Sequence, residues 1–294
     1  MGRFGSVLVA MVTPFDDALE LDLEAAVDLA RWLVDQGADG LVLAGTTGEA
    51  PTLSDDESVD LWTAVRGAVT VPLVAGTGSN DTRHTVELSR RAAATGVDGL
   101  LVVTPYYNRP SQAGLEAHFR AVAEATDLPF LIYDIPVRTG RKVDSEVLVR
   151  LAREVPTMVG VKDAAGDPGA SARVIAEAPD GFDLYSGDDA FTLPLLAVGG
   201  TGVIGVAAHW SAPEHAEMIS AHAKGDVETA RLLNARLLDS YDFETWGGTP
   251  QAVTTKTLLR TLGLRVGLTR PPIGPVPDGL EDAARRVLDG LGPR

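Results

Sequence analysis

The sequence contains no cysteine, and only 5% of its 294 residues are aromatic. Without cysteine, disulfide bonds, thiolate nucleophiles and thiolate metal ligands are excluded. Positive charge is also scarce, because 25 Lys and Arg residues stand against 41 Asp and Glu residues, giving a net charge of −16. This excess repels nucleic-acid backbones and anionic membrane surfaces, so we expect neither as a partner.

Long apolar runs and recognisable metal motifs are absent as well. The first apolar run, residues 7–12, is too short for a signal peptide or a membrane span, which predicts a cytoplasmic protein. The histidines show no metal-ligand spacing; they are His84, His118, His209, His215 and His222. We therefore expect no metal and no metal-dependent aldolase chemistry.

Nucleotide-binding loops are not expected either. Residues 200–205 match the pattern G-x-G-x-x-G, but they follow a helix-like stretch and run into an apolar strand. A dinucleotide site needs the opposite order, strand then turn then helix. Because the G-x-x-x-x-G-K-[ST] sequence is also missing, the sequence predicts no nucleotide cofactor.

Short apolar runs alternate with longer amphipathic stretches eight times along the chain. The expected strands recur about every 28 residues, the size of one βα unit. They are residues 7–12, 40–44, 71–75, 99–103, 129–133, 158–161, 182–185 and 202–206. This alternation predicts a (β/α)8 TIM barrel over residues 1–210. Residues 211–294 are expected to form a barrel-closing, C-terminal helical extension, with helices at 213–224, 226–242, 249–262 and 280–291.

In such a barrel, catalytic groups lie where the strands end. Lys162 follows the sixth expected strand and is one of only four lysines in the chain. Burial at this edge would lower the pKa of its ammonium group and free the amine as a nucleophile toward a carbonyl. A lysine that reaches solvent, or that forms a buried ion pair with Asp163 or Asp188, is the alternative that position alone leaves open.

Hydroxyl groups gather at neighbouring strand ends. Tyr133 ends the fifth strand, and Thr46, Thr47 and Tyr107 follow the second and fourth strands. Such groups can pass protons to and from a carbinolamine, although a buried tyrosine is often only a core residue. The glycines on either side of Thr46 and Thr47 let backbone N–H groups approach a small carboxylate, or serve only a tight turn. Arg138, in a loop bounded by Pro and Gly, suits either a second carboxylate or a surface ion pair.

Together these segments closely resemble the dihydrodipicolinate synthase / N-acetylneuraminate lyase family of class I aldolases, over essentially the whole chain. The motifs are G-T-T-G-E at 45–49, T-P-Y-Y-N-R-P at 104–110, Y-D-I-P-V-R-T-G at 133–140 and G-V-K-D-A at 160–164. The tyrosine pair and the arginine of the third motif are typical of the synthase branch rather than of the sugar-acid lyases.

The resemblance implies catalytic roles. Lys162 would form a Schiff base with pyruvate, and Tyr133 would transfer protons that Thr46 and Tyr107 relay. In the family the relay tyrosine reaches the site from the adjacent subunit, so Tyr107 implies a dimer as the smallest active unit. Family members are commonly homotetramers built as dimers of dimers.

Binding roles follow from the same resemblance. Thr47, with main-chain groups at Gly187 and Ile204, would hold pyruvate, and Arg138 would bind the carboxylate of L-aspartate 4-semialdehyde. The product would be 4-hydroxy-tetrahydrodipicolinate, in lysine and diaminopimelate biosynthesis, with no metal or organic cofactor. The alternatives are cleavage or synthesis of 2-keto-3-deoxy sugar acids or N-acetylneuraminate, and a barrel that binds keto acids without catalysis.

The chain also departs from the family pattern. The tail segment 251–256 lacks the prolines of the usual N-P-x-P-x-K stretch. Lysine-inhibited relatives carry histidines and a glutamate where this chain has Asp55, Ser58 and His84, whereas Asn80 and Tyr106 are retained. We therefore predict weak or absent inhibition by lysine.

Overall fold

Eight parallel strands form a closed barrel in the computed structural model, which describes residues 2–292. They are β1 (Val7–Ala10), β2 (Gly40–Leu43), β3 (Leu73–Gly76), β4 (Gly99–Val103), β5 (Phe130–Asp134), β6 (Met158–Asp163), β7 (Asp183–Ser186) and β8 (Gly202–Gly205). Each pairs in parallel with its neighbour in the chain, and β1 pairs with β8 to close the ring. The predicted (β/α)8 barrel is confirmed.

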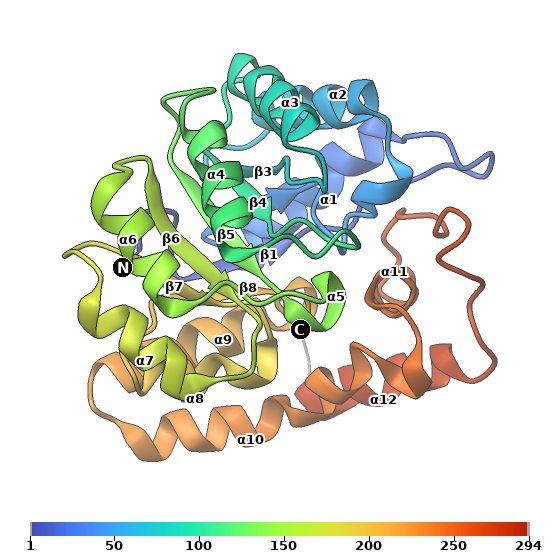
Figure 1. The fold of residues 1–294 in the computed structure, drawn as a ribbon. Helices are drawn as coiled ribbons and strands as arrows, with labels where there is room; N and C mark the ends of the chain where they lie inside the picture. The colour runs from blue at the N-terminus through green and yellow to red at the C-terminus, as the bar shows by residue number, and fades with distance from the viewer. Residues whose placement is uncertain (1, 293–294) are drawn as a thin grey trace.

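Helices surround the strands (Figure 1). Those of the first seven βα units are α1 (Leu23–Asp35), α2 (Asp55–Arg66), α3 (Thr82–Ala94), α4 (Gln112–Ala123), α5 (Pro136–Thr139), α6 (Ser145–Glu154), α7 (Pro168–Glu177) and α8 (Thr192–Leu196). Short 3₁₀ turns lie at η1 (Ala50–Thr52), η2 (Asp189–Phe191) and η3 (Trp246–Gly248). Because helices cover the outside and side chains fill the inside, the strands are buried on both faces, as their continuous apolar sequences indicate.

After β8 the chain is helical, as predicted: α9 (Ala208–Ala223), α10 (Val227–Phe243), α11 (Gln251–Thr261) and α12 (Leu280–Leu291). α10 packs on α9, and α12 packs on α10 and α11, around a second apolar core (Figure 1). Within residues 2–292, no helix is long and apolar enough to cross a membrane.

Most element boundaries differ from the expected ones by one or two residues, and the start of α9 differs by five. β6, for example, extends to Asp163 and therefore includes Lys162. β1 ends at Ala10 rather than at residue 12, because the backbone N–H of Val12 leaves the sheet and donates to Nε2 of His209, 3.1 Å away. α9 begins at Ala208, five residues before the expected start at Pro213, and continues across a kink at Ser211. Pro213 was expected to begin the helix because proline is common in the first helical turn. Instead it lies inside a longer helix, two residues after the kink. The domain division at 210/211 stays a prediction.

Candidate active site

Lys162 lies on β6 beside Tyr133 on β5, with which it is in register. Its side chain is only 5% exposed, and its Nζ lies 4.3 Å from the centre of the Tyr133 ring. Gly187 makes room for it, because a methyl group there would lie 2.9 Å from Cγ of Lys162. The end of β7 therefore has to be glycine for the lysine to keep this conformation.

The ion-pair alternatives for Lys162 are not observed. Asp163 points away from it and accepts hydrogen bonds from Oγ of Ser171 (2.6 Å) and from the N–H of Ala165 (2.9 Å). Among residues 2–292, no ion pair involves Lys162, with Asp188 or any other acid. Burial is the largest influence on Lys162 and lowers its pKa to about 8, although the charge of Asp189 raises it.

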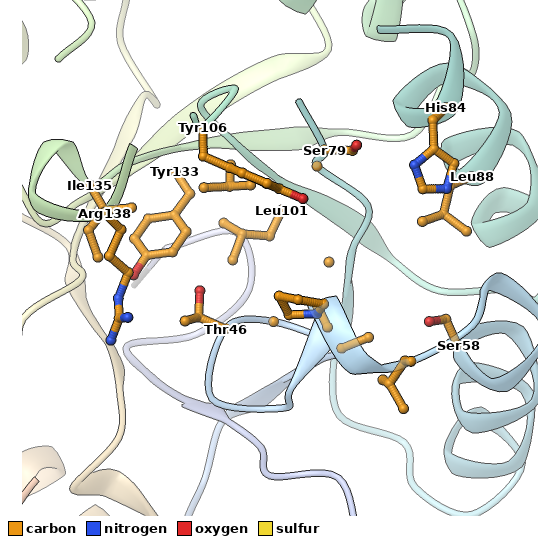
Figure 2. Close-up of a pocket in the computed structure, with 18 of the residues that line it drawn as sticks. Thr46, Ser58, Ser79, His84, Leu88, Leu101, Tyr106, Tyr133, Ile135 and Arg138 are labelled. Carbon is orange, nitrogen blue, oxygen red and sulfur yellow. The ribbon is translucent and has the colours of Figure 1, made fainter. Parts of the chain in front are cut away.

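Tyr133 and Thr46 come together above the lysine, at the rim of the barrel. The Tyr133 side chain is hydrogen-bonded to that of Thr46, and Figure 2 shows both beside Arg138. Burial raises the pKa of Tyr133 above its usual range, and the charge of Arg138 lowers it in part. The phenol therefore stays protonated at neutral pH, and its O–H is present as a hydrogen-bond donor.

The turn that carries Thr46 and Thr47 is fixed by buried contacts. Glu49, at φ +61°, places its carboxylate 2.7 Å from Nζ of Lys256 and accepts from the N–H of Arg270 at 2.9 Å. Thr47 is buried within this turn. The turn after β2 is thus held to α11 and to the segment that follows it.

A cavity of about 440 Å³ opens at this end of the barrel. Of the predicted residues, Thr46, Tyr133 and Arg138 line it, and Lys162 lies behind Tyr133. Ile204 belongs to the same barrel-interior cluster as Tyr133. The cavity also extends toward α2 and α3, where Figure 2 shows Ser58, Ser79 and His84. Asp55 belongs to the same lining.

Tyr107 is the predicted residue that lies farthest from its expected role, because its side chain points into solvent and does not line the cavity. Its side chain is 89% exposed, and its backbone has a φ of +73°. Its neighbour Tyr106 lines the cavity instead. Positive φ is costly for a tyrosine, so the loop stores strain while it presents Tyr107 outward.

Three residues near the site were missed in the sequence. The charge of Asp189 raises the pKa of Lys162. Gln251 accepts a hydrogen bond from Arg138 at 3.3 Å, and Glu244 accepts one from Gln251 at 2.9 Å. Asp189 had a signal, because it lies in the loop just after β7, where catalytic groups are expected. Glu244 and Gln251 come from the helical region more than 50 residues later. No local pattern marks Glu244, and although Gln251 begins the segment 251–256 that departs from the family pattern, nothing in the sequence connects that segment with Arg138.

The described part of the chain, residues 2–292, holds no group of three His, Asp or Glu residues suited to a metal ion. His209, the histidine that follows β8, is occupied: its ring contacts the backbone O of Val206 at 2.7 Å and the N–H of Val12 at 3.1 Å. Burial lowers its pKa to about 4, so it stays neutral and joins the ends of two strands.

A buried lysine with a lowered pKa, beside a protonated tyrosine at the strand ends of a (β/α)8 barrel, defines a site suited to imine formation with a carbonyl substrate. The chain belongs to the Dihydrodipicolinate synthetase family, whose sequence profile matches residues 3–290.

Named relatives are similar over nearly the whole chain. The 4-hydroxy-tetrahydrodipicolinate synthase of Acidothermus cellulolyticus is 52% identical over 92% of this chain and 87% of its own, and that of Bacillus subtilis is 42% identical over 93% and 94%. Among solved structures, a dihydrodipicolinate synthase of Bacillus anthracis has a TM-score of 0.95 at 39% identity, covering 100% of both chains. The enzyme of Cyanidioschyzon merolae with lysine bound has a TM-score of 0.96 at 39% identity, covering 99% of both.

Proposed function

We propose that this protein is a class I aldolase that condenses pyruvate with L-aspartate 4-semialdehyde to 4-hydroxy-tetrahydrodipicolinate, in lysine and diaminopimelate biosynthesis. The observation that carries the proposal is Lys162, buried at the end of β6 with a pKa lowered to about 8. Relatives that bear this enzyme's name and are 42–52% identical over most of the chain support this choice over a sugar-acid lyase.

The amine of Lys162 attacks the C2 carbonyl of pyruvate, and loss of water from the carbinolamine gives a protonated imine. The imine withdraws electrons, so the pyruvate methyl group loses a proton and becomes an enamine. The enamine carbon then attacks the aldehyde. Finally, the amino group of the second substrate attacks C2 and closes the ring, and Lys162 leaves as a free amine. The balance is one water released for each pair of substrates.

Tyr133 donates the proton that the carbinolamine hydroxyl needs to leave as water, with Thr46 as its hydrogen-bonded partner. Thr47 and the main chain at Gly187 and Ile204 hold the carboxylate of pyruvate. Arg138 binds the carboxylate of the aldehyde substrate at the cavity wall, because its guanidinium matches a carboxylate. In a chain with a net charge of −16, this local positive charge offsets the repulsion of acidic substrates.

Product formation from defined substrates tests the proposal. The purified protein is incubated with pyruvate and L-aspartate 4-semialdehyde, or with pyruvate and N-acetylmannosamine, and the products are identified by mass spectrometry. We expect turnover with the first pair only, and a loss of at least about 1,000-fold in Lys162→Ala. Lys224→Ala, a matched lysine at the end of α9, should keep full activity. Turnover with the sugar alone would support the lyase alternative, and none with either would support a non-catalytic barrel.

We further propose that Tyr107 completes the proton relay in a neighbouring subunit, within a dimer that pairs into a tetramer. The outward position of Tyr107 and its positive φ support this role. Co-expression of Lys162→Ala with Tyr107→Phe tests it. If the tyrosine acts across subunits, random pairing restores about a quarter of the wild-type sites. If Tyr107 acted within its own subunit, co-expression would restore no wild-type site.

The remaining parts of the proposal concern the cell and the cofactors. We place the enzyme in the cytoplasm and assign it no metal or organic cofactor, since the imine itself supplies the electron sink. Fractionation of cells tests the location. Activity that survives dialysis against a chelator tests the metal requirement, and loss of activity restored by a divalent ion would contradict it.

A further inference from the structure

Arg138 is held from outside the barrel by the first residue of α11. Its Nη2 donates to Oε1 of Gln251 at 3.3 Å, which is the single side-chain hydrogen bond of Arg138 within residues 2–292. The amide nitrogen of Gln251 donates in turn to Oε2 of Glu244 at 2.9 Å. A chain of hydrogen bonds thus runs from the cavity wall to a buried acid just after α10.

The orientation of the Gln251 amide is fixed by its two neighbours. A guanidinium group only donates hydrogen bonds, so the oxygen of the amide has to face Arg138. The nitrogen then faces Glu244, which offers it a carboxyl oxygen as an acceptor. Both ends of the amide are used, and a shorter or apolar side chain at this position would break the connection.

Glu244 is itself held by a second acid, Asp189. Both are buried, with 6% and 1% of their surfaces exposed, and their carboxyl groups are hydrogen-bonded to each other. Oδ2 of Asp189 accepts from the N–H of Val206 at 2.8 Å, and Oε2 of Glu244 accepts from Gln251. The two remaining oxygens, Asp189 Oδ1 and Glu244 Oε1, have no other hydrogen-bond partner within residues 2–292.

One proton between the two acids satisfies both free oxygens, since two buried carboxylates cannot both ionise side by side. Burial and the negative charge of Asp189 raise the pKa of Glu244 well above its usual range, so Glu244 carries the proton. His215 faces the same pair, with Nε2 3.5 Å from Oδ1 of Asp189. A protonated Glu244 is a rigid, neutral anchor for Gln251.

We propose that Gln251 is a positioning residue for the aldehyde substrate: anchored by the Glu244–Asp189 carboxyl pair, it holds Arg138 at the cavity wall, where the guanidinium meets the substrate's carboxylate. This inference rests on the proposed function, because it assumes a substrate with that carboxylate. The helical region after the barrel thereby sets the affinity for the second substrate. The side-chain hydrogen bonds of Gln251 go to Arg138 and Glu244 and not to Lys162, so we expect its loss to act mainly through the second substrate.

Gln251→Leu tests the role because it keeps most of the volume and removes both hydrogen bonds. Arg138 then has to be ordered by the substrate alone, and we expect the KM for L-aspartate 4-semialdehyde to rise about tenfold. The KM for pyruvate and kcat should stay within about twofold. Gln251→Glu should raise the same KM further, because its carboxylate competes with the substrate for Arg138.

Gln112→Leu is a matched control. Gln112 is also half-buried and begins a helix, α4, and both ends of its amide are used, by the backbone O of Lys142 at 2.8 Å and the N–H of Asp144 at 3.0 Å. It lies outside the cavity lining, so its removal should leave both KM values unchanged.

Two variants at position 244 separate positioning from folding. Glu244→Gln keeps the shape and the neutral charge, so the KM for the aldehyde should stay within about twofold of wild type. Glu244→Leu removes the anchor and should reproduce the effect of Gln251→Leu. An unchanged aldehyde KM in Gln251→Leu, with an active wild type, would overturn this inference and leave the proposed function intact. An inactive wild type that forms no pyruvate imine would instead overturn the proposed function, and this inference with it.

Discussion

The lowered pKa of Lys162 predicts how imine formation depends on pH. Burial brings the pKa from 10.5 to about 8, so about one lysine in ten is a free amine at pH 7. At the ordinary value the fraction would be about one in 3,000, so desolvation raises the concentration of the nucleophile about 300-fold.

The fraction of free amine sets the shape of the pH profile. Below pH 8, the second-order rate constant for imine formation with pyruvate should rise about tenfold per pH unit, and near pH 8 it should level off. Arg138→Leu should move the inflection to higher pH, because the charge of Arg138 lowers the pKa of Lys162. A shift of the inflection to higher pH distinguishes this electrostatic effect from the loss of a structural contact, which would change the rate constant without moving the inflection.

Rapid quenching with borohydride measures the rate. Pyruvate is kept well below saturation, so that the profile reports the free enzyme. Intact mass gives the fraction of reduced adduct at each time. An inflection near 10.5, or one that moves to lower pH in Arg138→Leu, would refute the claim that burial activates this lysine.

Other parts of the molecule give further predictions. Tyr133→Phe should lower kcat about 100-fold in steady-state assays while the KM for pyruvate changes little, because only the proton donor is lost; an unchanged kcat would exclude Tyr133 as that donor. Lys256→Met should lower the Tm by about 10 °C, because Glu49 is left as a buried, unpaired charge. Adding Glu49→Gln should recover part of this loss, and full stability of Lys256→Met in a thermal melt would contradict the reasoning. Lysine at millimolar concentration should not inhibit, since the acid lining that end of the cavity, Asp55, is already paired with His84 at 2.8 Å; a cooperative inhibition curve would show otherwise.

Much of the fold was predictable because each βα unit carries its own signal. The apolar runs that predict the strands are local in the sequence. Because the carboxyl ends of parallel strands meet at one edge, the sequence alone predicted that Lys162 and Tyr133 lie close together, as the register of β5 and β6 confirms. The ends of the strands were harder to predict. The backbone N–H of Val12 leaves the sheet to donate to His209, which is almost 200 residues away in the sequence, so no local pattern could show it.

The site was predictable only where its residues follow strands. Glu244 and Gln251 reach it through the packing of α10 and α11, which no spacing in the sequence encodes. The outward direction of Tyr107 depends on a strained loop conformation rather than on its place after β4. The tertiary contacts that anchor Arg138 therefore had to come from the structure.

Mass mapping of the pyruvate adduct identifies the residue that forms the imine. The intact protein is reduced with borohydride in the presence of pyruvate, digested and mapped, with Lys162→Ala as the control. We expect one reduced pyruvyl adduct, on Lys162, and none in the control. No adduct in the folded wild-type protein, or an adduct on Lys142, Lys224 or Lys256 instead, would contradict it.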